Sequence, residues 1–159
     1  MKRQQLLAIV ILLLSLLFVY AAGAKALAYD RFVSDLGKSP LLQSFINEST
    51  LAKSVLGIEF LTVVLLHIPS TKKWGLYVAF IQLLVFTGYL SALYLFYPHS
   101  ACACNGILGA VTYPAHLVFN GVCTLVALLG IMVFNHLKKR PPLRVVYNAH
   151  ALTPAVDYR

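Results

Sequence analysis

Charged residues are scarce in this chain, and the acidic ones are fewer than the basic ones. The 159 residues include 13 Lys and Arg but only five Asp and Glu, and 11% of the chain is charged. Soluble proteins average about 25% charged and about 45–50% apolar residues, whereas 60% of this chain is hydrophobic. This composition excludes an ordinary soluble domain and indicates a membrane protein.

Long stretches that almost lack charge set the expected architecture. A helix needs about 20 mostly apolar residues to cross the hydrocarbon core of a bilayer. We predict spans at about residues 6–29, 51–68, 74–97 and 114–136. The expected fold is an all-α membrane protein, a four-transmembrane-helix bundle formed by residues 1–137, with a basic, proline-containing cytoplasmic tail at 138–159. The small residues Ala22-Gly23-Ala24 resemble a signal-peptide cleavage site, but the apolar run is longer than the usual 7–15 residues, so we favour a retained span.

The net charge of +8 is distributed in a pattern that indicates topology. Basic residues cluster before the first span, between the second and third, and after the fourth: Lys2, Arg3, Lys72, Lys73, Lys138, Lys139, Arg140 and Arg144. In a chain that crosses four times, all of these lie on one side, which the positive-inside rule assigns to the cytoplasm. We therefore expect a protein of the bacterial inner membrane with both termini on the cytoplasmic side. The partner of this basic chain is then the lipid bilayer rather than nucleic acid.

The first periplasmic loop is expected to contain a short interfacial helix. Phe32, Val33 and Leu36 recur at helical spacing, and Gly37 occupies a stop position. This helix would lie over the outer face of the bundle.

Three charged side chains fall within the predicted spans, and one of them, Lys53, is at the edge of the second. Lys25 lies near the outer end of the first span, where a lysine can extend its amine to the head groups. Glu59 lies about 12 Å inside the second span, too deep to reach water. An acid at that depth is usually paired or faces the bundle interior. A Lys25–Glu59 pair fits the spacing, either as a structural link between spans or as a group that handles protons or contacts a ligand.

Further polar residues form stripes on the third and fourth spans. Gln82 and Tyr89 share one face of the third span, and we expect Gln82 to bond across helices. His116 and Asn120 form one stripe with Cys123 on the fourth. A single cysteine in this position is most simply a small core residue.

The loop between the last two spans contains Cys102-Ala103-Cys104. A disulfide that closes so short a loop gains almost no stability from loop closure. A redox role fits better, because strained, exposed disulfides are the readily reduced ones. His99 and His116 flank the pair and could stabilise the reactive thiolate. A zinc or copper site formed by these two histidines and the two cysteines is an alternative, although the spacing is not that of a standard finger.

Several segments together resemble the MauE branch of the DoxX-like membrane proteins, which are small four-helix proteins associated with redox functions. The matching features run from Val19 to about Ile131: Tyr20-Ala21-Ala22, Lys25, Asp30-Arg31-Phe32, Leu36-Gly37-Lys38-Ser39-Pro40, Glu59, Cys102-Ala103-Cys104-Asn105-Gly106 and His116-Leu117-Val118-Phe119-Asn120.

The resemblance implies a thiol–disulfide role for Cys102 and Cys104. Methylamine-utilisation members are thought to assist disulfide formation with a thioredoxin-like partner, and the wider group includes proteins linked to quinone-dependent oxidation. Membrane disulfide generators of the DsbB and vitamin K epoxide reductase types have two cysteine pairs, whereas this chain has one pair and Cys123. The pair therefore either passes electrons directly to a quinone or relays them between proteins.

The main hypothesis is an inner-membrane thiol:disulfide or thiol:quinone oxidoreductase. Cys102, Cys104 and His116 would perform the chemistry, while Lys25, Glu59, Tyr89, His99 and Asn120 line the binding region. The alternative is a non-enzymatic integral-membrane subunit of a larger envelope complex, in which the cysteines are structural or bind metal.

Overall fold

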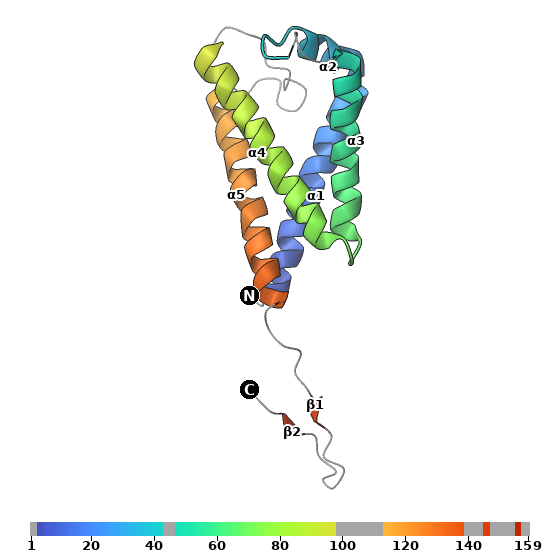
Figure 1. Cartoon of the computed structure of the whole chain (residues 1–159), viewed down its shortest axis with the longest axis vertical. Coiled ribbons are helices and arrows are strands. Elements are labelled where there is room, and N and C mark those ends of the chain that lie inside the picture. Colours follow the sequence, from blue (N-terminus) through green and yellow to red (C-terminus); the bar gives the residue numbers. More distant parts are fainter. Residues whose placement is uncertain (1–2, 43–46, 98–112, 139–144, 147–154, 157–159) are drawn as a thin grey trace.

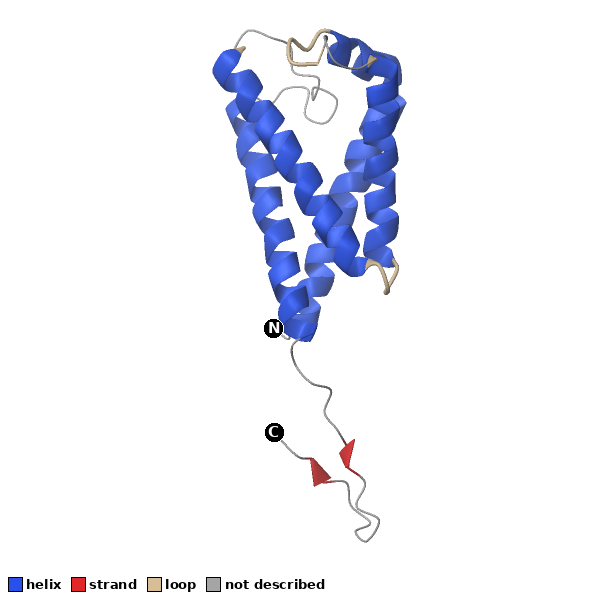
Figure 2. Ribbon diagram, viewed as in Figure 1, coloured by secondary structure: helices blue, strands red, loops and turns tan. Residues whose placement is uncertain are grey.

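In a computed structural model, the chain forms a helical bundle followed by one short pair of strands (Figures 1 and 2). The structure describes residues 3–42, 47–97, 113–138, 145–146 and 155–156. Its helices are α1 (Arg3–Leu27), α2 (Tyr29–Gly37), α3 (Glu48–His67), α4 (Lys72–Phe96) and α5 (Tyr113–Lys138). Strands β1 (Val145–Val146) and β2 (Ala155–Val156) pair antiparallel, with Val145 opposite Val156.

The helices α1, α3, α4 and α5 are each long and apolar enough to cross a membrane, as the composition predicts. A helix satisfies its own backbone hydrogen bonds, which is required where no water is present to do so. α3 begins before the apolar run because Asn47 caps it. The Asn47 side chain accepts hydrogen bonds from the backbone N–H groups of Ser49 and Thr50, at 3.0 and 3.3 Å.

The four long helices form a ring in which α1 and α4 each pack against both α3 and α5. The start of α1 lies beside the end of α5, where Arg3 Nη1 is 3.4 Å from His136 Nδ1. The turn between α3 and α4 lies at the same end of the bundle (Figure 1). We call this the closed end, because it surrounds the main apolar core: Val10, Leu14, Phe18, Leu66, Leu76, Ala79, Leu83, Ala127 and Ile131.

The helix predicted in the first loop is present as α2, which lies across the opposite end of the bundle (Figure 1). Its apolar side packs on α3, where Phe32, Leu36 and Ala52 form a second buried cluster with Val33 against it. These are the apolar positions expected from the sequence. α2 therefore holds the end of α1 and the start of α3 in a fixed relation.

Candidate functional site

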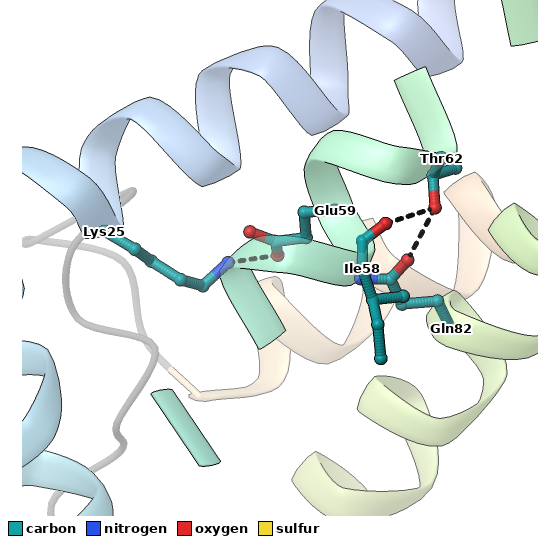
Figure 3. A network of polar contacts seen from close by, with 5 residues as sticks. All are labelled: Lys25, Ile58, Glu59, Thr62 and Gln82. Atoms are coloured by element: carbon teal, nitrogen blue, oxygen red, sulfur yellow. Dashed lines mark hydrogen bonds and ion pairs between the residues drawn. The ribbon is translucent and has the colours of Figure 1, made fainter. Parts of the chain in front are cut away.

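Lys25 and Glu59 form a buried ion pair near the α2 end of the bundle (Figure 3). Lys25 lies in the last turn of α1 and Glu59 in the middle of α3. Lys25 Nζ donates to Glu59 Oε1. Lys25 is only 8% exposed and Glu59 1%, so the lysine does not extend outwards to the head groups. The pair that the sequence suggested is present, because α1 and α3 are neighbours in the ring.

Two aromatic rings lie beside the lysine of this pair, and one carboxylate oxygen of the glutamate lacks a hydrogen-bond partner among the residues described. Lys25 Nζ lies 5.5 Å from the ring centroid of Phe86 and 5.9 Å from that of Phe32, within range of cation–π attraction. The second carboxylate oxygen of Glu59, Oε2, is buried and has no hydrogen-bond partner among the residues described. A buried acceptor without a donor is costly, which marks this atom as a point where a ligand or water could bind.

A cavity of about 60 Å³, which we call the polar chamber, adjoins the ion pair. Residues of all four long helices line it. Its polar lining residues are Lys25, Glu59, His116 and Asn120, and its apolar lining residues are Leu17, Phe18, Ala21, Leu83, Phe86 and Phe119. A water needs at least about 10–15 Å³ of such volume and two to four polar partners. Most of the exposed lining surface is apolar, and the volume is well below the about 300–1,000 Å³ of typical small-molecule pockets.

Tyr89, which the sequence placed with the binding residues, lies outside the lining of the polar chamber. Its hydroxyl is 2.7 Å from Oγ of Ser39, which is fully buried after the end of α2. This contact joins α4 to the segment that follows α2. Gln82, by contrast, bonds across helices as predicted, accepting from the Thr62 hydroxyl at 3.1 Å (Figure 3).

A family model described as methylamine utilisation protein MauE matches residues 3–133 of the chain. The chain belongs to the MauE family. The match covers α1 to α4 and most of α5, and with four apolar helices it identifies a multi-pass membrane protein. It names MauE alone, so the relation to the wider DoxX-like group stays a prediction. Neither a curated protein nor a solved structure matches the chain significantly.

The sulfur pair of this MauE-family chain is not among the residues that the structure describes. Cys102, Cys104 and His99 all lie outside those ranges, as does most of the alternative metal-ligand set. The segment that carries them is attached to the last residue of α4 and the first of α5, which both lie at the α2 end (Figure 1). Cys123 is a free, half-buried thiol packed against the apolar core, in line with the role expected for it.

The aromatic lining of the chamber was not recognised from the sequence. A signal was present, because Phe18, Ala21 and Lys25 share one face of α1 at i, i+3 and i+7. Phe119 immediately precedes Asn120 on α5. Aromatic residues are common in apolar spans, and only the arrangement of helices shows which of them face the ion pair.

Proposed function

We propose that this protein is an inner-membrane thiol–disulfide redox protein. Its Cys102–Cys104 pair would exchange with a thioredoxin-fold or other exported partner, as in a thiol:disulfide oxidoreductase. The observation that carries this proposal is the attachment of the Cys-Ala-Cys segment to the α2 end, where Lys25, Glu59, His116 and Asn120 converge. Membership of the MauE family supports the same assignment.

The proposed exchange is one half of a relay between proteins, and a second exported disulfide, which is itself reduced, takes up the two electrons and regenerates the Cys102–Cys104 disulfide. A thiolate of the reduced partner attacks one sulfur of the Cys102–Cys104 disulfide, and the bond between the two sulfurs breaks as a mixed disulfide forms. The other thiolate of the same partner then attacks the partner's sulfur in the mixed disulfide and releases the cysteine of the pair. Two electrons and two protons pass to Cys102 and Cys104, and the partner leaves oxidised. Run backwards, the same steps reduce the partner, so the potentials of the two couples set the direction.

His116 and His99 would stabilise the thiolate, which is the reactive form of cysteine. His116 lies in the first turn of α5 and lines the polar chamber. Lys25 and Glu59 line the same chamber as an ion pair, so together they add no net charge to it. The proposed role of Lys25, Glu59 and Asn120 is to bind and orient groups beneath the cysteine segment.

The distribution of charge supports a periplasmic location for the cysteine segment. At the closed end lie Arg3, the lysines that open α4, and Lys138 (Figure 1). The α2 end carries Asp30, Asp35 and Glu48 together with Arg31, Lys38 and Lys53, so its charges balance and the excess of basic residues is at the closed end. By the positive-inside rule the closed end faces the cytoplasm. The α2 end then faces the oxidising side, where disulfides form and persist, and α2 lies at the outer interface.

A quinone acceptor is implied by the wider resemblance. The polar chamber, at about 60 Å³, does not fit a quinone in this conformation. The relay proposed above requires the two cysteines and two exported partners, one that is oxidised and one that is reduced, and it involves no step on a bound quinone.

The test is the thiol state of the pair in cells. We expect alkylation to show Cys102 and Cys104 cycling between reduced and oxidised forms. Cys102→Ser or Cys104→Ser should trap a mixed disulfide or abolish partner oxidation. Cys123→Ser is the matched control, and it should leave the cycle intact because Cys123 packs in the core. If the Cys102/Cys104 double variant left exported thiols unchanged, the redox proposal would be wrong.

A non-enzymatic subunit role is favoured by one separate feature. The family match ends at residue 133, and the chain continues with basic residues and the β1–β2 pair. A tail of this kind suits docking to a larger envelope complex. Cysteines that stay unchanged in the alkylation assay, together with co-purification of a stable assembly that is lost on deletion of residues 139–159, would support this function instead.

A further inference from the structure

A groove lies on the outside of the bundle between α3 and α4. It measures about 290 Å³, and its lining residues are Val55, Ile58, Val78, Ile81, Gln82, Val85 and Phe86. All but Gln82 are apolar. The side chains of Ile58, Ile81 and Val85 are 46%, 55% and 63% exposed, so the groove faces the lipid when the bundle spans a membrane.

Gln82 places an incompletely paired amide in this groove. Its Oε1 accepts from the hydroxyl of the buried Thr62 at 3.1 Å (Figure 3), and its Nε2 has no hydrogen-bond partner among the described residues. Gln82 lies about 15 Å along α4 from Lys72, near the middle of a hydrocarbon core about 30 Å thick. An N–H group without an acceptor is costly at that depth, because no water is present to accept from it.

Lipid fills the apolar part of such a groove but cannot pair the amide. Acyl chains carry no acceptor, and the oxygens of lipids lie at the head groups, about 15 Å away from the middle of the core. The exposed side chains at a similar depth on α1 and α5 are apolar and need no acceptor: Leu12, Leu13, Leu16, Val122, Leu125 and Leu129. The groove therefore differs from these faces in requiring an acceptor that a protein supplies.

A second copy of the chain carries an acceptor at the required depth. Copies that insert with the same topology place Gln82 at the same depth, and the amide oxygen keeps a second lone pair beside the one that Thr62 uses. In a dimer with a two-fold axis along the membrane normal, the same surface meets itself. Ile81 and Val85 are more than half exposed, so each copy also has apolar side chains to pack into the groove of the other.

We propose that the α3–α4 groove is the interface of a parallel homodimer within the membrane. The free end of the Gln82 amide bonds to the partner subunit's Gln82, and the apolar lining packs around this contact. Phe86 lines both the groove and the polar chamber, so the second copy also covers the outward side of the ring that lies 5.5 Å from Lys25 Nζ. The inference concerns association alone and does not depend on thiol exchange by Cys102 and Cys104.

Photocross-linking of the full-length protein in native membranes tests the interface. Val85→p-benzoylphenylalanine should give an adduct of twice the mass of the chain, and the adduct should carry both tags when two differently tagged copies are co-expressed. The same substitution at Leu125 of α5 is the matched control, because Val85 and Leu125 lie at similar depths and are 63% and 65% exposed. The absence of a protein adduct at Val85, an adduct with a different protein, or equal yields at the two positions would overturn the proposal.

Two further variants separate the packing from the amide, with association measured by energy transfer between donor- and acceptor-labelled copies in lipid vesicles. Val85→Trp overfills the interface and should weaken dimerisation about fivefold or more, whereas Leu125→Trp should not change it. Gln82→Leu should weaken dimerisation about threefold for each hydrogen bond lost, the factor that the average interhelical bond implies. A Val85→Trp dimer as tight as that of Leu125→Trp would refute the groove as the interface. A Gln82→Leu dimer as tight as the unmodified one would refute the amide contact.

Discussion

The closed end and the α2 end of the bundle are packed by opposite means. At the closed end Leu14, Leu66 and Leu76 are at most 1% exposed. There α4 comes close to the backbone of α3 at Gly75. At the α2 end the interior instead holds Lys25, Glu59, His116 and Asn120 around a cavity. Lipid is as apolar as leucine, so close packing stabilises the first region, and hydrogen bonds and ion pairing must stabilise the second. Polar groups inside a membrane are costly, and this is why we place the proposed function at the end where they concentrate.

The largest expected effect is the loss of one partner of the ion pair. Glu59→Ala leaves the Lys25 ammonium buried and unpaired, and we expect it to destabilise the bundle by about 3–5 kcal/mol. Unfolding of the purified protein in detergent measures the change. The double variant Lys25→Met/Glu59→Met removes both charges and should recover most of the loss. If the single and double variants were equally unstable, the charge imbalance would not be the cause.

The second largest effect is expected at the closed end, where α3 and α4 are in close contact. A Cβ atom added at Gly75 would lie 2.8 Å from the backbone N of Leu66 and 2.9 Å from the carbonyl C of Leu65. Backbone cannot move aside cheaply, so Gly75→Ala should cost about 1–3 kcal/mol, as overpacking does.

Gly88 on the same helix is the control, because a Cβ atom there would meet nothing within 4 Å. Gly88→Ala should be neutral or stabilising by up to about 1 kcal/mol, through higher helix propensity. The same unfolding assay applies to both variants. Equal stability of the two would show that α3 and α4 are not in close contact at Gly75.

The smallest effect concerns the contact that lies between the two regions. Thr62 is fully buried, and its single hydroxyl proton is shared between the Ile58 carbonyl of its own helix, at 2.7 Å, and Gln82 Oε1 of α4, at 3.1 Å (Figure 3). Hydrogen bonds between membrane helices average about 0.6 kcal/mol. A double-mutant cycle of Thr62→Val and Gln82→Leu should give a coupling of that size, and a coupling near zero would contradict the contact.

Much of the fold was predictable because single helices have local causes. The number of long helices, the stop of α2 at Gly37 and its apolar positions Phe32 and Leu36 follow from hydropathy and spacing. The start of α3 was placed too late, since Asn47 caps a polar first turn that hydropathy alone does not detect. Tyr89 was grouped with the binding residues by its position on one face of α4, but its hydroxyl meets Ser39, 50 residues away.

By itself, the sequence determined that this is a membrane protein of four apolar helices with most of its basic residues before the first span, between the second and third, and after the fourth. Length, hydropathy and charge order are properties of the chain. Only the tertiary structure decided that Lys25 meets Glu59 rather than the head groups, and that the Phe86 ring lies 5.5 Å from Lys25 Nζ in the lining of the polar chamber. The physical reason is that spacing assigns a residue to a face of its own helix. Which face meets which neighbour depends on the order of helices in the ring, and that order follows from packing of the whole bundle.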